Sequence, residues 1–315
     1  MKKLFTCLGL LAALTANAQE PAFPQRGPLE ITVLFPAGSS ADVTARMLAD
    51  GMAKHLGQRV LVVNRPGAGG AIGYKYVQAQ KPDGYSLVWN SNSISTTFHS
   101  GQLNFDYQAF EAVARVLAES VVVAVRTDAP WRTLNDLIAD AKARPKAISV
   151  GHSGIGSHTH ISLAALASAA RVEVNEVPFA AAQVVPSLVG GHVNAVVQFP
   201  GALAAPLKQG QIRLLAALTQ NRDPAWPNVP TARELGFEVV LDAWRGIAVP
   251  RGTPRPVISA LEASIRSTVS SSEFQKSSEN LGVRPAFLPA GEFGQLIAAE
   301  DAALARLMHQ IGLKK

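Results

Sequence analysis

Short runs of aliphatic and β-branched residues alternate along the chain with stretches whose apolar residues recur at helical spacing. The short runs predict buried strands, and helices are predicted between them, for example where Ala45, Leu48 and Met52 share one face. Such alternation is typical of an α/β protein with parallel sheets covered by helices, whose ligands lie beyond the strand ends. The predicted strands are residues 31–35, 60–63, 87–89, 121–125, 148–150, 193–199 and 212–218.

The last third of the chain has a helical pattern and shows no sheet of its own. We expect this part to return to the first domain, so that two strand-like segments, near residues 121–126 and 239–250, cross between two lobes as a hinge. The predicted helices of this part are residues 254–271, 272–281 and 291–311. The expected division is a signal peptide at residues 1–18, a first lobe at 19–124 plus 245–315, and a second lobe at 125–244.

The N-terminus has the pattern of a secretory signal peptide. Two lysines precede an apolar run at residues 4–14, and Ala16 and Ala18 fit a small-residue cleavage site. We therefore expect a soluble, exported chain that begins at Gln19. The single cysteine, Cys7, lies in the removed segment, so the mature chain should have no disulfide and no thiolate metal site.

The charge balance argues against a nucleic-acid-binding protein. The full chain has 29 Lys and Arg against 23 Asp and Glu, and removing Lys2 and Lys3 leaves 27 against 23. The basic residues are scattered rather than clustered, which is untypical of a nucleic-acid or membrane tract but suits an anionic ligand.

The loop after the first predicted strand is a candidate ligand site because it opens a helix. Helix N-termini present unpaired N–H groups and a partial positive charge, which favour a carboxylate. Gly38 would allow close backbone approach, and Ser39 and Ser40 could donate hydroxyl hydrogen bonds. The candidate residues of this loop are Ala37, Gly38, Ser39, Ser40 and Asp42. For Asp42 a helix-capping role competes with a role in holding water or a ligand ammonium group.

A second loop of this kind carries Ser157, Thr159 and His160, which could donate hydrogen bonds from the opposite lobe. Neither loop contains lysine or arginine, so recognition is expected to rely on backbone N–H groups and hydroxyls. Two alternatives stay open. Ser157 could simply cap its helix while His160 packs on the sheet, or His160 could join His152 and His158 as metal ligands, although their spacing matches no common zinc pattern.

Polar residues also follow other predicted strands. Ser91 and Asn92 come after one strand, Gln198 lies at the end of another, and Trp244 lies on the second crossing segment. We expect these four residues to line the same cleft, with an ordinary turn and simple Trp packing as the competing interpretations.

No catalytic residue or cofactor is predicted. The glycines at residues 67–73 miss the dinucleotide-binding register because Ile72 stands at the last glycine position. The segment at residues 151–155 misses the nucleophile elbow because Ile155 stands where glycine is required.

Several motifs resemble the solute-binding proteins of tripartite tricarboxylate transporters, also called the Bug family of extracytoplasmic receptors. The most specific pair is NRPGAGGAIG at residues 64–73 followed by PDGY at 82–85. FPAGSSAD at residues 35–42 is similar to the family's first ligand loop, and GIGSHTH at 154–160 to the loop of its second lobe. The chain departs from the family pattern at Ser39 and Ser40 and at residues 180–183.

The resemblance implies a two-lobed periplasmic binding protein of type II-like fold with a hinge of two crossing segments. It also implies a small organic acid as ligand, a ligand contact from Phe179, and a monomer that delivers its ligand to transporter membrane subunits in the Gram-negative periplasm. A periplasmic hydrolase and a sensory receptor are the competing functions.

Overall fold

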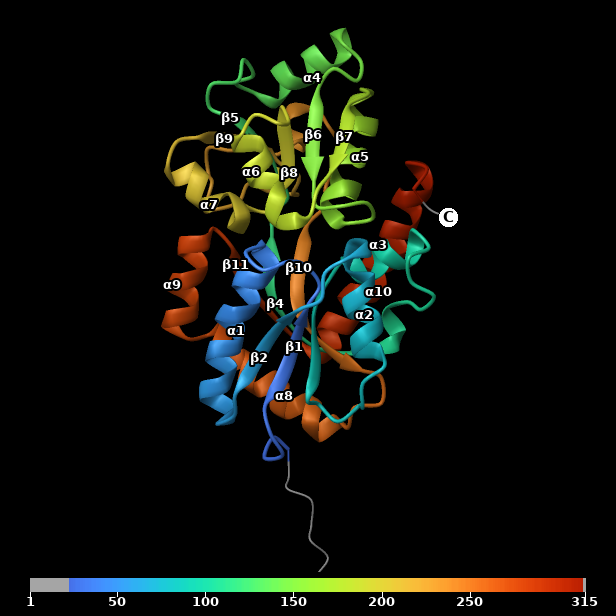
Figure 1. Cartoon of the computed structure of the whole chain (residues 1–315), viewed down its shortest axis with the longest axis vertical. Coiled ribbons are helices and arrows are strands. Elements are labelled where there is room, and N and C mark those ends of the chain that lie inside the picture. The colour runs from blue at the N-terminus through green and yellow to red at the C-terminus, as the bar shows by residue number, and fades with distance from the viewer. Residues whose placement is uncertain (1–22, 314–315) are drawn as a thin grey trace, which may run out of the picture.

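The computed structural model describes residues 23–313, which form two α/β lobes stacked along the long axis of the molecule (Figure 1). Extended segments join the lobes near its middle. The predicted signal peptide, residues 1–18, and the expected first mature residue, Gln19, lie outside the described residues. Across residues 23–313, no helix combines the length and apolar character that a membrane crossing requires.

The first lobe is built on a six-stranded sheet with the order β11-β4-β10-β3-β1-β2. Strands β1, β2 and β3 are parallel, whereas β10, β4 and β11 pair antiparallel with their neighbours. Only β1, β2 and β3 therefore have the parallel arrangement expected from the alternation, because β4 leads out to the second lobe and β10 returns beside it in the opposite direction. The strands are β1 (Leu29–Val33), β2 (Val60–Asn64), β3 (Ser86–Ser91), β4 (Phe110–Glu119), β10 (Ala243–Pro250) and β11 (Arg284–Pro289).

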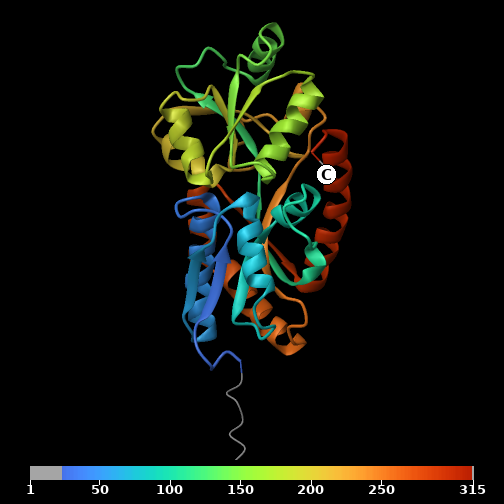
Figure 2. The same cartoon turned by 45° about the vertical axis from the view of Figure 1, so that its right-hand side comes forward.

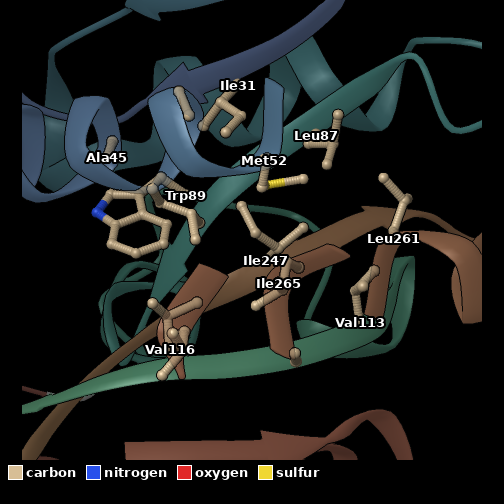
Figure 3. Packing of buried hydrophobic residues seen from close by; sticks show 14 of the residues in the cluster. Ile31, Ala45, Met52, Leu87, Trp89, Val113, Val116, Ile247, Leu261 and Ile265 are labelled. Atoms are coloured by element: carbon tan, nitrogen blue, oxygen red, sulfur yellow. The ribbon is translucent and has the colours of Figure 1, made fainter. Parts of the chain in front are cut away.

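Helices cover both faces of this sheet, as the alternating pattern predicts. Figure 3 shows the core on one face, where Ala45 and Met52 of α1 and Leu261 of α8 face buried side chains of the strands, including Leu87 and Ile247. The helices of this lobe are α1 (Ser40–Leu56), α2 (Ala71–Gln78), α3 (Ser93–His99), α8 (Arg255–Val269), α9 (Ser272–Leu281) and α10 (Ala290–Gln310).

The second lobe contains a five-stranded sheet with the order β7-β6-β8-β5-β9. This sheet is also mixed, because β5 pairs antiparallel with both β8 and β9. Its strands are β5 (Val122–Arg126), β6 (Ser149–His152), β7 (Asn175–Pro178), β8 (Ala195–Gln198) and β9 (Ile212–Ala217). Its helices are α4 (Leu134–Ala143), α5 (His158–Ala170), α6 (Val184–Val189) and α7 (Pro200–Lys208). Short 3-10 helices lie at Ala68–Gly70, Tyr107–Ala109, Ala181–Gln183 and Arg233–Leu235.

The chain changes sheets twice. The first change falls between Glu119, the last residue of β4, and Val122, the first residue of β5. The second precedes Ala243, the first residue of β10. Both changes lie a few residues earlier than the expected division after residues 124 and 244, because β5 pairs wholly within the second sheet and β10 begins its pairing opposite Glu119.

Helix α10 makes a further contact between the lobes. It rises beside the first lobe toward the second (Figures 1 and 2). Its residues Leu304 and Met308 form a small buried apolar cluster with Ile161 of α5.

Candidate functional site

A small pocket lies between the two lobes, at the carboxyl ends of strands from both sheets. Helix N-termini, a strand end and the start of β10 all contribute side chains to it. The lining residues are Phe35, Ser39, Ser40, Ala41, Ser91, Asn92, Ser93, Ser153, Ser157, His158, Thr159, Ala181, Gln198, Phe199, Ala243, Trp244 and Arg245. The site therefore has the position expected for a ligand cleft in an α/β protein.

The first wall of the pocket is the N-terminus of α1. Ser39 caps the helix, because its Oγ accepts a hydrogen bond from the backbone N–H of Asp42 at 3.3 Å. The Ser40 hydroxyl donates to Oε1 of Glu119 at 2.6 Å. Within residues 23–313 the backbone N–H groups of Ser40 and Ala41 have no hydrogen-bond acceptor, so this helix end offers free donors beside the pocket.

The opposite wall is the N-terminus of α5. Ser157 caps this helix by accepting from the His160 N–H at 3.2 Å, and its hydroxyl lies 3.1 Å from that of Thr159. Thr159 Oγ1 also accepts from the Ser153 N–H at 2.9 Å, which orders the preceding loop. Among the described residues, the backbone N–H groups of His158 and Thr159 have no acceptor. Each lobe thus presents one helix N-terminus with a serine cap to the same pocket.

Four other predicted residues lie on the pocket wall, namely Ser91, Asn92, Gln198 and Trp244. Asn92 Oδ1 accepts from the backbone N–H of Trp244 at 3.0 Å. Gln198 is held by two bonds, with Nε2 donating to Ser153 Oγ at 3.0 Å and Oε1 accepting from its neighbour's N–H at 2.8 Å. All four side chains are buried.

Five predicted residues lie outside the pocket lining: Ala37, Gly38, Asp42, His160 and Phe179. Gly38 is turned away because its N–H donates to Asp42 Oδ2 at 3.0 Å. Burial opposes ionisation of Asp42, but bonds from Arg46, Gly38 and Asn64 hold the pKa of this carboxyl below its usual value. Asp42 therefore orders the loop from within the first turn of α1, whereas the capping residue of this helix is Ser39.

The structure does not gather His152, His158 and His160 into one group. His158 lies apart, with Nε2 3.2 Å from the Leu241 carbonyl. The rings of His152 and His160 stack at 4.5 Å, and Glu176, rather than a third histidine, lies beside them.

This cluster favours hydrogen bonding over metal binding. Nδ1 of His160 accepts from the Gly156 N–H at 3.0 Å, so the proton of the neutral ring is on Nε2, which lies 3.1 Å from Glu176 Oε2. A metal at Nε2 would have to displace that proton. Burial, with the neighbouring His160 ring, lowers the pKa of His152 to about 4.

Phe179 packs on the backbone of the second sheet. Its ring would lie 3.2 Å from a side chain added at Gly151, so it fills the space beside that glycine. The residue predicted from resemblance alone thus packs against the apolar cluster that β5, β8 and α6 contribute to, rather than lying on the pocket wall.

Comparison with known proteins identifies the group to which the chain belongs. Residues 44–313 match the sequence profile described as "Tripartite tricarboxylate transporter family receptor". This chain belongs to that family. A curated relative of this receptor, the "UPF0065 protein in gbd 5'region" of Cupriavidus necator, is 30% identical over 307 residues, which cover 97% of this chain and 93% of the relative.

Two solved structures are similar to the receptor over most of their length. One is a TctC solute-binding protein from Polaromonas without ligand, with a TM-score of 0.70 and 31% identity over 91% of this chain and 99% of that one. The other is R. palustris Rpa4515 with adipate, with a TM-score of 0.86 and 26% identity over 92% of this chain and 98% of that one. The two-lobed binding-protein fold is thereby confirmed.

Sequence reasoning missed part of the receptor's pocket. Arg245, Phe199 and His158 all line it, and none was predicted as a ligand contact, although His158 was considered as a metal ligand. The available signal for Arg245 was a lone charged residue inside the apolar run of β10. No comparable signal marked His158 as a wall residue, because its loop suggested the helix start but not which side chains turn inward.

Proposed function

We propose that this receptor encloses a small organic acid between its lobes, in the Gram-negative periplasm, and delivers it to the membrane subunits of a tripartite tricarboxylate transporter. One observation carries the proposal: two helix N-termini, one from each lobe, present unpartnered N–H groups and serine hydroxyls to one pocket. Such helix ends are ready sites for an anionic group. The adipate in the similar Rpa4515 structure is an acid of the proposed class.

The mechanism we propose is hinge closure. A ligand bound at the helix N-terminus of one lobe would recruit the other lobe, with residues 23–119 plus 243–313 and residues 122–242 moving as units about the two crossings. The greater likeness to the adipate complex, at a TM-score of 0.86 against 0.70 for the ligand-free protein, supports the view that the described conformation is a closed one. A closed monomer would then be the form that docks on the transporter.

The pocket chemistry favours a receptor over a hydrolase. A serine nucleophile needs a histidine or another base within hydrogen-bond reach. In the described part of the chain, no serine hydroxyl of the pocket is hydrogen-bonded to a histidine ring. Burial lowers the pKa of His158 to about 4, and its Nε2 is already engaged by the Leu241 carbonyl.

The test is a thermal-shift screen of succinate, malate, adipate and citrate, followed by calorimetry and scattering on the acid that stabilises most. We expect binding of at least one acid, compaction or an unchanged closed form in scattering, and recovery of the acid unaltered. The monoamide of that acid is the matched control, because it keeps the shape and loses one charge. Equal binding of acid and amide, or turnover of the bound compound, would contradict the proposal. A pull-down that returns a signalling protein instead of transporter subunits would favour the sensory function.

A further inference from the structure

A buried cation lies in the wall of the pocket. Arg245 belongs to β10, a strand that is buried along its whole length, and only 3% of its surface is exposed. A buried guanidinium is costly unless it is paired. The groups that contact Arg245 therefore indicate which interactions stabilise its charge.

One edge of the guanidinium is used within the protein. Its Nε donates to Oε2 of Glu119, whose side chain is fully buried. The other carboxylate oxygen of Glu119 accepts from the Ser40 hydroxyl at 2.6 Å. The face of the guanidinium lies 4.9 Å from the ring centroid of Phe199. Each oxygen of Glu119 thus has a partner, the Ser40 hydroxyl on one and a single N–H of Arg245 on the other.

The other end of Arg245 is unused. In residues 23–313 its two terminal nitrogens, with four N–H donors, have no hydrogen-bond acceptor. Neither terminal nitrogen is completely sealed from solvent, and Arg245 lines the pocket. The terminal edge of the guanidinium therefore keeps access to the pocket, beside the N-terminus of α1 that Ser40 begins.

We propose that Arg245 is the cationic anchor of this receptor, binding one ligand carboxylate in plane through its two terminal nitrogens. The inference rests on the proposed function and names a ligand contact that the two helix loops do not supply. A guanidinium matches a carboxylate bidentately, which gives it strength and planar selectivity that lysine lacks. Glu119 fixes the orientation of the fork through Nε, and Phe199 covers one of its faces.

The anchor also couples ligand charge to closure. Arg245 lies on a strand of the first sheet, whereas Phe199 follows β8 of the second sheet and precedes α7. Closing the lobes places the Phe199 ring over the guanidinium and removes water from it, which strengthens its interaction with an anion. A neutral ligand would gain nothing from this arrangement.

The experiment measures affinity by calorimetry with the acid, among succinate, malate, adipate and citrate, that binds the unmodified receptor most tightly. The variant is Arg245→Gln combined with Glu119→Gln, which removes both buried charges together and leaves neither unpaired. We expect a folded protein whose affinity falls on the order of 100-fold, since two charge-assisted hydrogen bonds are lost at about tenfold each. Its preference for the acid over the monoamide should fall as well.

Two further variants keep the inference falsifiable. Arg245→Lys retains the charge but loses the planar fork, so its affinity should fall about tenfold even if the double variant does not fold. Arg115→Gln is the matched control, because Arg115 donates to the Ala286 carbonyl away from the pocket and should leave affinity unchanged. Unchanged affinity in a folded double variant, or in Arg245→Lys, would overturn the anchor and leave the proposed function standing. Failure of all four acids to bind the unmodified receptor would overturn both.

Discussion

Trp244 donates its backbone N–H to Oδ1 of Asn92 at 3.0 Å, so the second crossing strand is tied to the segment that follows β3. The side chains of both residues also donate to one oxygen of Glu300 on α10. Burial raises the pKa of Glu300 to about 7, with the bonds from Trp244 opposing the rise. Two walls of the pocket thus depend on one partly buried carboxyl group.

Glu300→Gln should change stability in a pH-dependent way. The pKa of Glu300 rises from 4.5 to about 7 on folding, so the folded state holds the proton more tightly. Ionised Glu300 therefore destabilises the fold progressively as pH rises from about 4.5 to 7, and has no such effect below that window. The variant should gain stability relative to the unmodified protein across the same window, by up to about 3 kcal/mol. Thermal unfolding at pH 5 and pH 8 measures this, and an equal difference at both would contradict it.

Ser157→Ala should weaken ligand binding roughly tenfold, because the hydroxyl of a pocket-lining helix cap is lost at the point where a carboxylate would be held. The same change should lower the free energy of unfolding by about 1 kcal/mol through loss of the cap. Ser271→Ala is the matched control, because Ser271 caps α9 in the same way without lining this pocket. Calorimetry and chemical denaturation separate the two effects. Equal affinity of the two variants would show that the Ser157 hydroxyl does not reach the ligand.

Gly246→Ala should destabilise the first lobe by about 2 kcal/mol or more. A Cβ at this position of β10 would lie 2.5 Å from the Ala114 carbonyl oxygen and from the Phe293 ring, so the strand or the ring has to shift. Gly294→Ala is the control, since its nearest neighbour would be 3.9 Å away and alanine favours the helix by about 0.5 to 1 kcal/mol. Denaturant melts of the two variants should therefore move in opposite directions. A shift of both in the same direction would refute the packing argument.

The mature protein should begin at Gln19, because Ala16 and Ala18 occupy the small-residue positions of a cleavage site. Intact-mass analysis of the periplasmic fraction gives the N-terminus directly. A species that retains residues 1–18 would disprove this expectation.

Local pattern was enough for the strands that consist of aliphatic runs, but not for β4, β7 and β11. Strand β4 reads FEAVARVLAE, in which Ala, Glu and Arg favour helix, and pairing with β10 and β11 overrides that preference. Strand β11 contains Pro285 and Pro289, which weaken a strand signal and are tolerated because it lies at the sheet edge. The sequence also did not predict which neighbouring strands run parallel and which antiparallel, because this depends on where the chain re-enters a sheet.

The loops that begin α1 and α5 could be predicted from the sequence, because helix capping depends on residues close together in the chain. The serine caps at Ser39 and Ser157 lie one residue before the helices that they begin. The pairing of Glu119 with Arg245 was not readable, because 126 residues separate them and only the β4–β10 register brings them together. The remaining misses depended on local orientation, because the Gly38 N–H points to Asp42 and the His160 ring turns toward Glu176.

The apolar cluster of Leu304, Met308 and Ile161 bears on how the empty receptor distributes itself between conformations. Helix α10 is packed on β4 and α3, so its end cannot follow α5 if the lobes separate. Opening would then expose three side chains to water, and this penalty is independent of any ligand. In the proposed hinge motion, this penalty would shift the ligand-free population toward the closed form. Less of the ligand's binding free energy would then be needed to close the lobes. The measured affinity would rise by the factor by which the population of the closed form increases.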